Sequence, residues 1–178
     1  MLFRSYLDLP FPHEQQIAYS ISDAAKRGFL AAYGEGTKAF ANHAPNTWAV
    51  THMMWDPSRD PQAMMDDFYQ SAYGPVANEM REYFGTYSKA LDENWPKRAR
   101  VMDAPGLAYV NVVNSWHIVY PPSVIDQAED WLKKAEAKAP PGEYRERLQL
   151  HRIGQDYTRV MVRLLDCYRQ LAQLGMKM

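Results

Sequence analysis

The stretch from residue 46 to residue 84 constrains the fold of this chain more than any other, because it holds three helical patterns separated by proline and glycine. The first pattern ends before Pro57, since a proline disfavours helical backbone in the preceding residue and donates no backbone hydrogen bond. The second begins with Asp60 as the N-cap and Pro61 at the first helical position, and Gly74 ends it. The third pattern starts directly afterwards.

Apolar residues recur at helical spacing in the second and third patterns, and in each they fall on one face. Two amphipathic helices joined at one Gly-Pro corner must bury these faces against each other or against a third element. The faces consist of Met64, Met65, Phe68, Tyr69, Ala72 and Tyr73 in the second pattern and of Val76, Met80, Tyr83, Phe84, Tyr87 and Leu91 in the third. This part of the chain is therefore predicted to form a folded core.

Composition excludes several classes of protein. A chain of 178 residues is long enough for one domain with a core. Its hydrophobic share of 47% excludes a disordered chain. It carries 20 basic and 21 acidic side chains without a block of like charges. Because nucleic acids and anionic membranes attract basic surfaces, we predict no nucleic-acid partner and no membrane partner.

An α/β pattern precedes the helical stretch. Residues 13–27 are predicted to form a helix that closes at Gly28, and residues 29–33 are a short apolar run typical of a buried parallel strand. Loops beyond the carboxyl ends of such strands form the ligand sites of α/β proteins. The best-placed polar groups are therefore Tyr33, Glu35, His43 and Asn46.

The remainder of the chain is predicted to be largely helical. The β-branched segment 109–120 is either extended or the end of a helix, and its sequence does not decide between the two. One helix then runs from Pro121 to the Pro-Pro-Gly sequence at 140–142. A long helix follows, in which Gly154 costs about 1 kcal/mol. The single cysteine, Cys167, lies among leucines of this helix and is predicted to be a buried structural thiol.

A resemblance to a known family rests on residues 47–84. They read TWAVTHMMWDPSRDPQAMMDDFYQSAYGPVANEMREYF and resemble a stretch of large bacterial carbohydrate-related proteins that carry the domain of unknown function numbered 4838. The matching elements are Trp55-Asp56-Pro57, Asp60, Phe68-Tyr69, Tyr73-Gly74, Met80-Arg81 and Tyr83-Phe84. The loop at 33–36 and the helix start at 120–122 match in order, so the resemblance covers most of residues 6–175.

The resemblance implies proteins similar to glycoside hydrolases of the α-glucuronidase and β-hexosaminidase kind, with a (β/α)8 barrel followed by a helical region. Such a barrel takes about 250 residues. We therefore expect a mostly α chain, with the last strand-helix units of a truncated (β/α)8 barrel in residues 1–56 and a C-terminal helical region in residues 57–178. The missing N-terminal part of the barrel would be its partner in cis. Residues 1–12 lack the pattern of a signal peptide, although relatives of this kind are often exported.

Glycoside cleavage needs two carboxylates about 5 to 10 Å apart. Glu35, at the end of the predicted strand, is one candidate catalytic residue, and Asp8, near the preceding strand end, is a weaker second. Glu35 could instead accept a hydrogen bond from a sugar hydroxyl, or be a solvated loop acid. The candidate substrate-binding residues are Tyr33, Glu35, His43, Asn46 and Trp48.

Two tryptophans and two histidines could contact a ligand or could have only structural roles. Trp48 and Trp55 could present flat faces to sugar rings, but tryptophans on amphipathic helices usually pack in the core, and Trp55 is predicted to do so. His43 and His52 are not at the spacing of a helical metal pair, so no metal site is predicted. The sequence contains no Gly-rich phosphate-binding loop, so no cofactor is predicted.

Two functions follow. The chain is the C-terminal part of a carbohydrate-active enzyme, which binds a carbohydrate substrate through the full-length protein and is inactive as an isolated fragment. The alternative is a non-catalytic helical interaction or scaffold module.

Overall fold

The computed structural model describes residues 8–30, 40–101 and 116–174. Its elements are the helices α1 Glu14–Lys26, α2 Phe40–Trp55, α3 Pro61–Tyr73, α4 Ala77–Val101, α6 Trp116–Val119, α7 Pro122–Lys138 and α8 Glu143–Gln173, with the short 3-10 helix η1 Gly74–Val76. No β-strand occurs in these three ranges. The prediction of a mostly α chain is confirmed.

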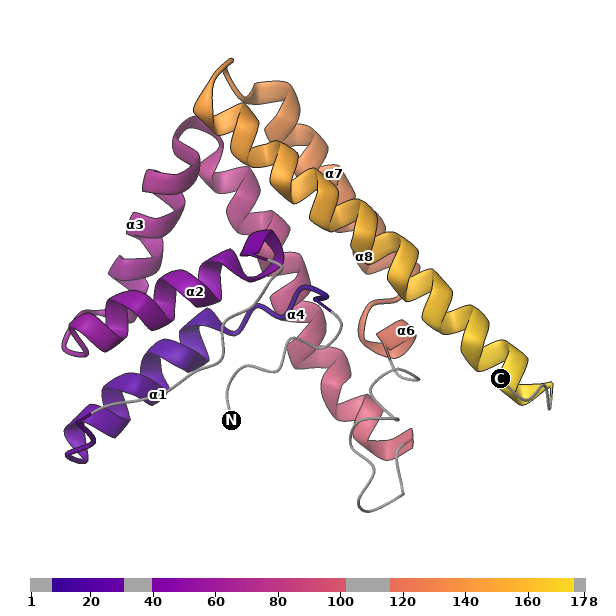
Figure 1. The fold of residues 1–178 in the computed structure, drawn as a ribbon, viewed down its shortest axis with the longest axis horizontal. Coiled ribbons are helices and arrows are strands. Elements are labelled where there is room, and N and C mark those ends of the chain that lie inside the picture. Colours follow the sequence, from indigo (N-terminus) through magenta and orange to yellow (C-terminus); the bar gives the residue numbers. More distant parts are fainter. Residues whose placement is uncertain (1–7, 31–39, 102–115, 175–178) are drawn as a thin grey trace.

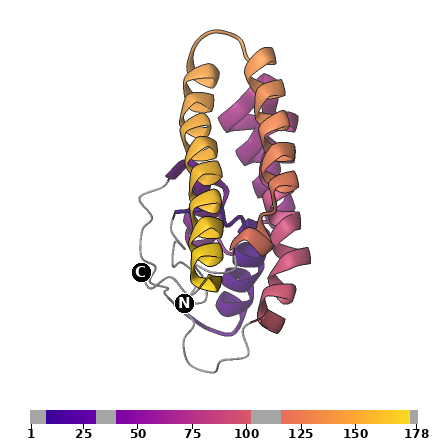
Figure 2. The ribbon, with the colours of Figure 1, turned by 90° about the vertical axis from the view of Figure 1, so that its right-hand side faces the viewer.

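The helices form two arms of a V (Figure 1). In one arm α1 and α2 lie side by side and pack on α3. In the other arm α7 and α8 form a hairpin, with α4 packed along α7. A second view shows this hairpin along its length (Figure 2). The arms join where η1 links α3 to α4.

The central stretch folds as its local signals predict. The side chain of Asp60 accepts a hydrogen bond of 2.8 Å from the backbone N–H of Ala63 and so caps α3. Gly74, with φ of +46°, ends that helix. The predicted apolar faces of α3 and α4 are buried, except for the half-buried Ala72. These residues form the centre of the core.

The predicted strand at 29–33 is wrong in the part that the structure describes. Phe29 and Leu30 have no regular structure, and their side chains are 67% and 100% exposed. Residues 31–33 lie outside the described residues. A parallel strand needs neighbouring strands to pair with and helices over both faces, and the described ranges contain no strand to serve as a neighbour. No strand-helix unit of a barrel is therefore seen in them.

Two predictions of burial are also wrong. Trp55, the last residue of α2, is 91% exposed, and Cys167 lies exposed on α8. Helical spacing shows which residues share a face, but not which other element covers that face. The undecided segment before α7 ends as the helix α6; its residues 109–115 lie outside the described ranges.

Gly154 lets α8 approach α2 closely. A Cβ atom at this position would lie 2.3 Å from Oδ1 of Asn42. The Asn42 side chain cannot easily move away, because its Nδ2 donates a hydrogen bond of 2.6 Å to the backbone carbonyl of Asp8. The helix interruption seen in the sequence is thus a packing requirement.

Gly154→Ala is expected to lower the free energy of unfolding by about 1–2 kcal/mol, measured by urea denaturation. Overpacking costs about 1–3 kcal/mol and outweighs the gain of about 1 kcal/mol in helix propensity. Gly85→Ala in α4 is the matched control, because a Cβ there meets nothing within 4 Å, and it should stabilise the protein. A similar change in stability for both variants would contradict the close approach.

Candidate functional site

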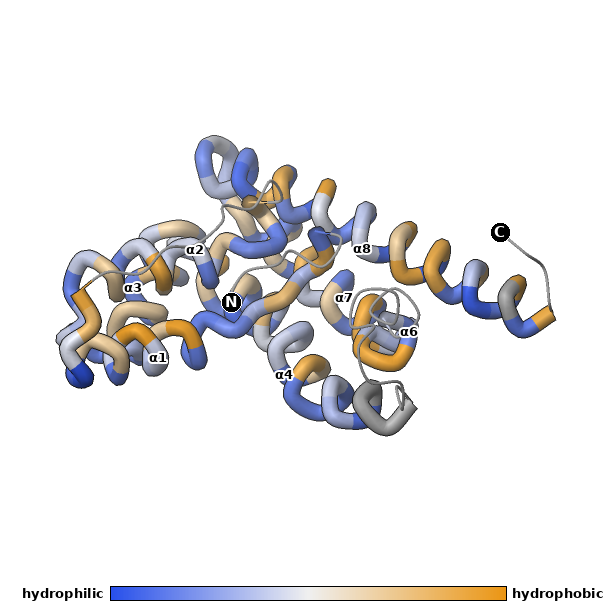
Figure 3. Tube along the Cα trace, turned by 60° about the horizontal axis from the view of Figure 1, so that its bottom comes forward, coloured by the Kyte–Doolittle hydropathy of each residue, from blue (hydrophilic) through white to orange (hydrophobic). Residues whose placement is uncertain are grey.

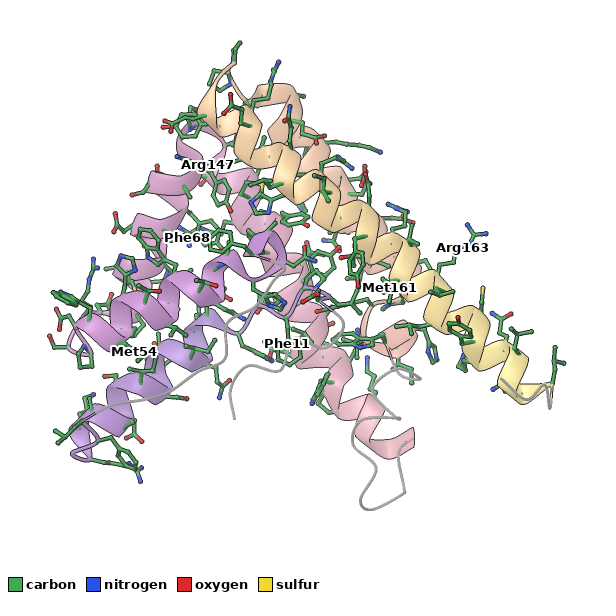
Figure 4. All side chains as sticks on the ribbon, viewed as in Figure 1. Phe11, Met54, Phe68, Arg147, Met161 and Arg163 are labelled. Atoms are coloured by element: carbon green, nitrogen blue, oxygen red, sulfur yellow. The ribbon has the colours of Figure 1, made fainter. Side chains whose placement is uncertain are left out.

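An apolar hollow lies between α2, α3 and α8, and we call it the aromatic pocket. Its volume of about 440 Å³ falls in the range of small-molecule sites. Phe68 and Arg147, labelled in Figure 4, lie between the two arms of the V. The lining comprises Phe40, Ala41, Ala44, Thr47, Trp48, Thr51 and His52 of α2, Phe68, Ser71, Ala72 and Tyr73 of α3, and Arg147, Leu150 and His151 of α8.

Flat rings dominate one wall of the aromatic pocket. The rings of Trp48 and His52 stack with their centroids 3.9 Å apart and their planes 21° from parallel. Phe68 lies 5.5 Å from the Trp48 ring, between centroids. Because Trp48 and His52 are four residues apart on α2, the helix itself sets their stacking. This wall suits the apolar face of a ring-shaped ligand.

Several polar groups of the aromatic pocket form hydrogen bonds within the protein, whereas Nε1 of Trp48 and Nδ1 of His151 are buried without a hydrogen-bond partner among the described residues. The hydroxyl of Tyr73 and Nε2 of His151 are 2.8 Å apart. Burial lowers the pKa of His151 to about 4, against a smaller opposing effect of the Ala41 backbone. Arg147 donates from Nη1 to the carbonyl of Ala72 at 2.7 Å, at the end of α3. Because the pKa of His151 is lowered to about 4, its imidazole is uncharged at neutral pH.

The lining of the aromatic pocket contains no aspartate or glutamate among the described residues. It therefore lacks the pair of carboxylates that glycoside cleavage uses. The arrangement can bind a ring by stacking and by contact with hydroxyl groups, but its described residues offer no carboxyl group to act as general acid or nucleophile.

Three of the predicted site residues, Asp8, His43 and Asn46, lie on the side of α2 that faces the segment before α1, and none of them lines the aromatic pocket. Asn46 accepts a hydrogen bond of 2.9 Å from the backbone of His13 and donates one of 2.7 Å to the carbonyl of Phe11. Burial lowers the pKa of His43, and the nearby Asp8 opposes this effect. Asn46 therefore ties α2 to the segment before α1, which is a structural role.

The other predicted site residues divide differently. Trp48 lines the aromatic pocket, on the opposite side of α2 from Asn46. Tyr33 and Glu35 lie outside the described residues. Their predicted roles in binding and catalysis stay predictions.

A second, polar hollow of about 580 Å³ lies between α1, α3 and α4. Glu14 lines it, and the Oε2 atom of this side chain is buried without a hydrogen-bond partner. Burial raises the pKa of Glu14, and the nearby Asp92 raises it further. The guanidinium of Arg81 lies 4.5 Å from the ring centroid of Tyr69 and pairs with Asp66 at 2.6 Å. Sequence reasoning missed Glu14, because an acid in a first helical turn is normally a solvated partner of the helix dipole.

Neither a metal-ligand cluster nor a membrane-spanning helix occurs in the described part of the chain. It contains no group of three or more His, Cys, Asp or Glu side chains that could hold a metal ion. None of its helices is both long and apolar enough to cross a membrane.

Comparisons with known proteins leave one finding. No curated protein and no solved structure matches this chain. One family model matches the N-terminal part of the chain, which includes α1, α2 and α3 and hence two of the three walls of the aromatic pocket. Residues 3–85 match the family model described as a domain of unknown function (DUF4838).

Proposed function

We propose that this chain is the helical, C-terminal part of a carbohydrate-active protein, that its aromatic pocket contacts a sugar ring, and that it has no hydrolase activity by itself. The observation that carries the proposal is the stacked wall of Trp48, His52 and Phe68. It lies within the residues that match the family model. Sugar rings present an apolar C–H face that packs on flat aromatic surfaces, and the hydroxyls of Thr47 and Thr51 in the same lining can accept hydrogen bonds from sugar hydroxyls.

In the proposed full-length protein, residues 1–56 are the end of a (β/α)8 barrel and residues 57–178 are its helical extension. Helices α1 and α2 would then be the last outer helices of the barrel. The segments before them would pair as strands only beside the remaining strands, because a single strand has no partner for its backbone hydrogen bonds. The absence of acids from the lining described for the aromatic pocket supports a binding role here, with catalysis elsewhere.

Trp48→Ala is expected to weaken sugar binding about tenfold, which corresponds to about 1.4 kcal/mol and to the loss of one stacking contact. The probes are methyl glycosides of glucuronic acid and of N-acetylglucosamine, titrated into the chain and followed by the chemical shifts of the backbone N–H groups, which both variants retain. Trp55→Ala is the matched control, because Trp55 lies on the same helix, is highly exposed and does not line the pocket.

The outcomes separate the proposal from its rivals. Binding of neither glycoside by the wild-type chain, or an equal loss in both tryptophan variants, would count against a sugar-binding pocket. Hydrolysis of either glycoside by the chain alone would refute the non-catalytic part of the proposal.

A second candidate is a helical interaction module without a sugar site. The exposed apolar face of α8 favours it, because such a face normally contacts another protein surface. This candidate predicts association of the chain without binding of the glycosides.

A further inference from the structure

Apolar and polar residues alternate along the whole length of α8 (Figure 3), and the helix has a buried face and an exposed apolar face. The inner face is buried against the rest of the protein and includes Leu148, His151, Gln155, Thr158, Val162 and Leu165. The outer face is exposed, and we call it the outer stripe. It consists of Leu150, Ile153, Tyr157, Val160, Leu164, Cys167 and Leu171 of α8, together with Leu174, which directly follows the last residue of the helix.

The spacing of the outer stripe indicates what covers it. Its members are separated by steps of three and four residues in strict alternation from Leu150 to Leu174. This is the heptad repeat of a coiled-coil seam, in which a helix packs along another helix. The seam is about 36 Å long at 1.5 Å per residue. A flat globular surface does not require such a repeat, so the spacing favours a helix as the partner.

The two ends of the outer stripe differ in shape. Helix α8 has 31 residues and α7 has 17, so α8 extends past its hairpin partner (Figure 1). Leu165 is the last residue of α8 with a buried side chain among those described, and Leu171 and Leu174 lie exposed beyond it. At the other end a hollow of about 410 Å³ opens beside Leu150 and Ile153. The stripe thus has an exposed, projecting end at Leu171 and Leu174 and a hollow at its opposite end, beside Leu150 and Ile153.

We propose that two copies of this chain pair the outer stripes of their α8 helices antiparallel, about a twofold axis that crosses the stripe between Val160 and Leu164. In this register the stripe meets itself layer by layer. The layers are Leu150 with Leu174, Ile153 with Leu171, Tyr157 with Cys167, and Val160 with Leu164. The largest side chain of the stripe thus faces the smallest one, and the projecting end of each copy enters the hollow of the other.

Charges beside the stripe fit the same register. Asp156 and Arg163 flank the outer stripe on one side, and Figure 4 shows Arg163 pointing away from the body of the protein. Antiparallel pairing places Asp156 of each copy about 8 Å along the axis from Arg163 of the other, within reach of the long arginine side chain. The pairs also offset the repulsion between the two Arg163 side chains near the axis, so association should weaken at high salt.

The first test is the oligomeric state of the full 178-residue chain, measured by sedimentation equilibrium over a wide range of concentration. The wild type is expected to dimerise, and Val160→Glu should raise the dissociation constant by about 100-fold or more, because it buries a charge in the central layer. The Val160 side chain is 64% exposed in the single chain, so the circular dichroism of this variant should be unchanged. Tyr19→Glu, at an exposed apolar residue of α1, is the control and should dimerise like the wild type.

The second test uses the lone Cys167 to read orientation. In the antiparallel register the two Cys167 residues are about 15 Å apart along the axis, too far for a disulfide. Oxidant should therefore leave the wild type uncrosslinked, whereas Tyr157→Cys should give a covalent dimer through two equivalent bonds to Cys167. A wild type that crosslinks by itself would indicate parallel helices and overturn this register.

A wild-type chain that stays monomeric, or equal dissociation constants for the wild type and Val160→Glu, would overturn the pairing altogether. The result is independent of the proposed sugar site, because the outer stripe contacts the aromatic pocket only through Leu150. Val160→Glu should thus bind the methyl glycosides like the wild type.

Discussion

Arg152→Gln is expected to lower the free energy of unfolding by about 3 kcal/mol. Arg152 of α8 donates from Nη1 to both carboxylate oxygens of Glu129, at 2.8 and 2.7 Å. It donates from Nε and Nη2 to the two oxygens of Glu136, at 2.9 and 2.7 Å. Glu129 is only 9% exposed. Glutamine would leave this carboxylate with Lys133 at 3.3 Å and Arg159 at 3.8 Å as its remaining cationic partners. The expected loss therefore lies at the lower end of the roughly 3–5 kcal/mol that breaking a buried ion pair costs.

Urea denaturation at pH 7 measures this loss. Arg159→Gln is the matched control on the same helix, because Arg159 makes its close ion pair with Asp126, at 2.8 Å, between two exposed side chains, and approaches Glu129 only to 3.8 Å. Pairs of this kind contribute about 0–1 kcal/mol. If the two variants lose equal stability, the ion-pair cluster does not hold α8 on α7 as we infer.

The second large effect is a loss of stability in acid that depends on His151. In the folded protein burial lowers the pKa of this imidazole to about 4, whereas an unfolded histidine titrates at about 6.5. Between these values the unfolded state binds a proton and the folded state does not. Stability is therefore complete above about pH 6.5 and is lost as the pH falls towards 4. At about 1.36 kcal/mol per pH unit, the whole loss is about 3 kcal/mol.

His151→Gln isolates this contribution, because glutamine does not titrate and its amide can still form a hydrogen bond with the hydroxyl of Tyr73. Between pH 7 and pH 5 the wild type should lose about 2 kcal/mol more than this variant, measured by urea denaturation at each pH. His43 is also buried with a lowered pKa, so both proteins should lose some further stability. Parallel pH profiles for the wild type and His151→Gln would show that His151 titrates normally in the folded protein.

The candidate site was only partly predictable from the sequence. Trp48 was a predicted contact for a sugar ring, and it does line a pocket with other rings. Asn46 was a predicted substrate-binding residue because it follows the predicted strand. In the structure its side chain forms hydrogen bonds with the backbone of Phe11 and His13. His151 and Glu14 could not have been found, because their pKa values depend on burial by distant segments.

The sequence by itself determined where the central helices begin and end. The Asp60 cap, Pro61 and Gly74 act through hydrogen bonds and backbone angles within a few residues, so a local reading of the chain suffices. Tertiary structure alone decided what covers each element. In the folded chain Trp55 and Cys167 are exposed, and Phe29 and Leu30 have no strand to pair with among the described residues. Helix α8 has a buried face and, opposite it, an exposed apolar face. Burial arises between segments far apart in the chain, and no local pattern encodes which of them will meet.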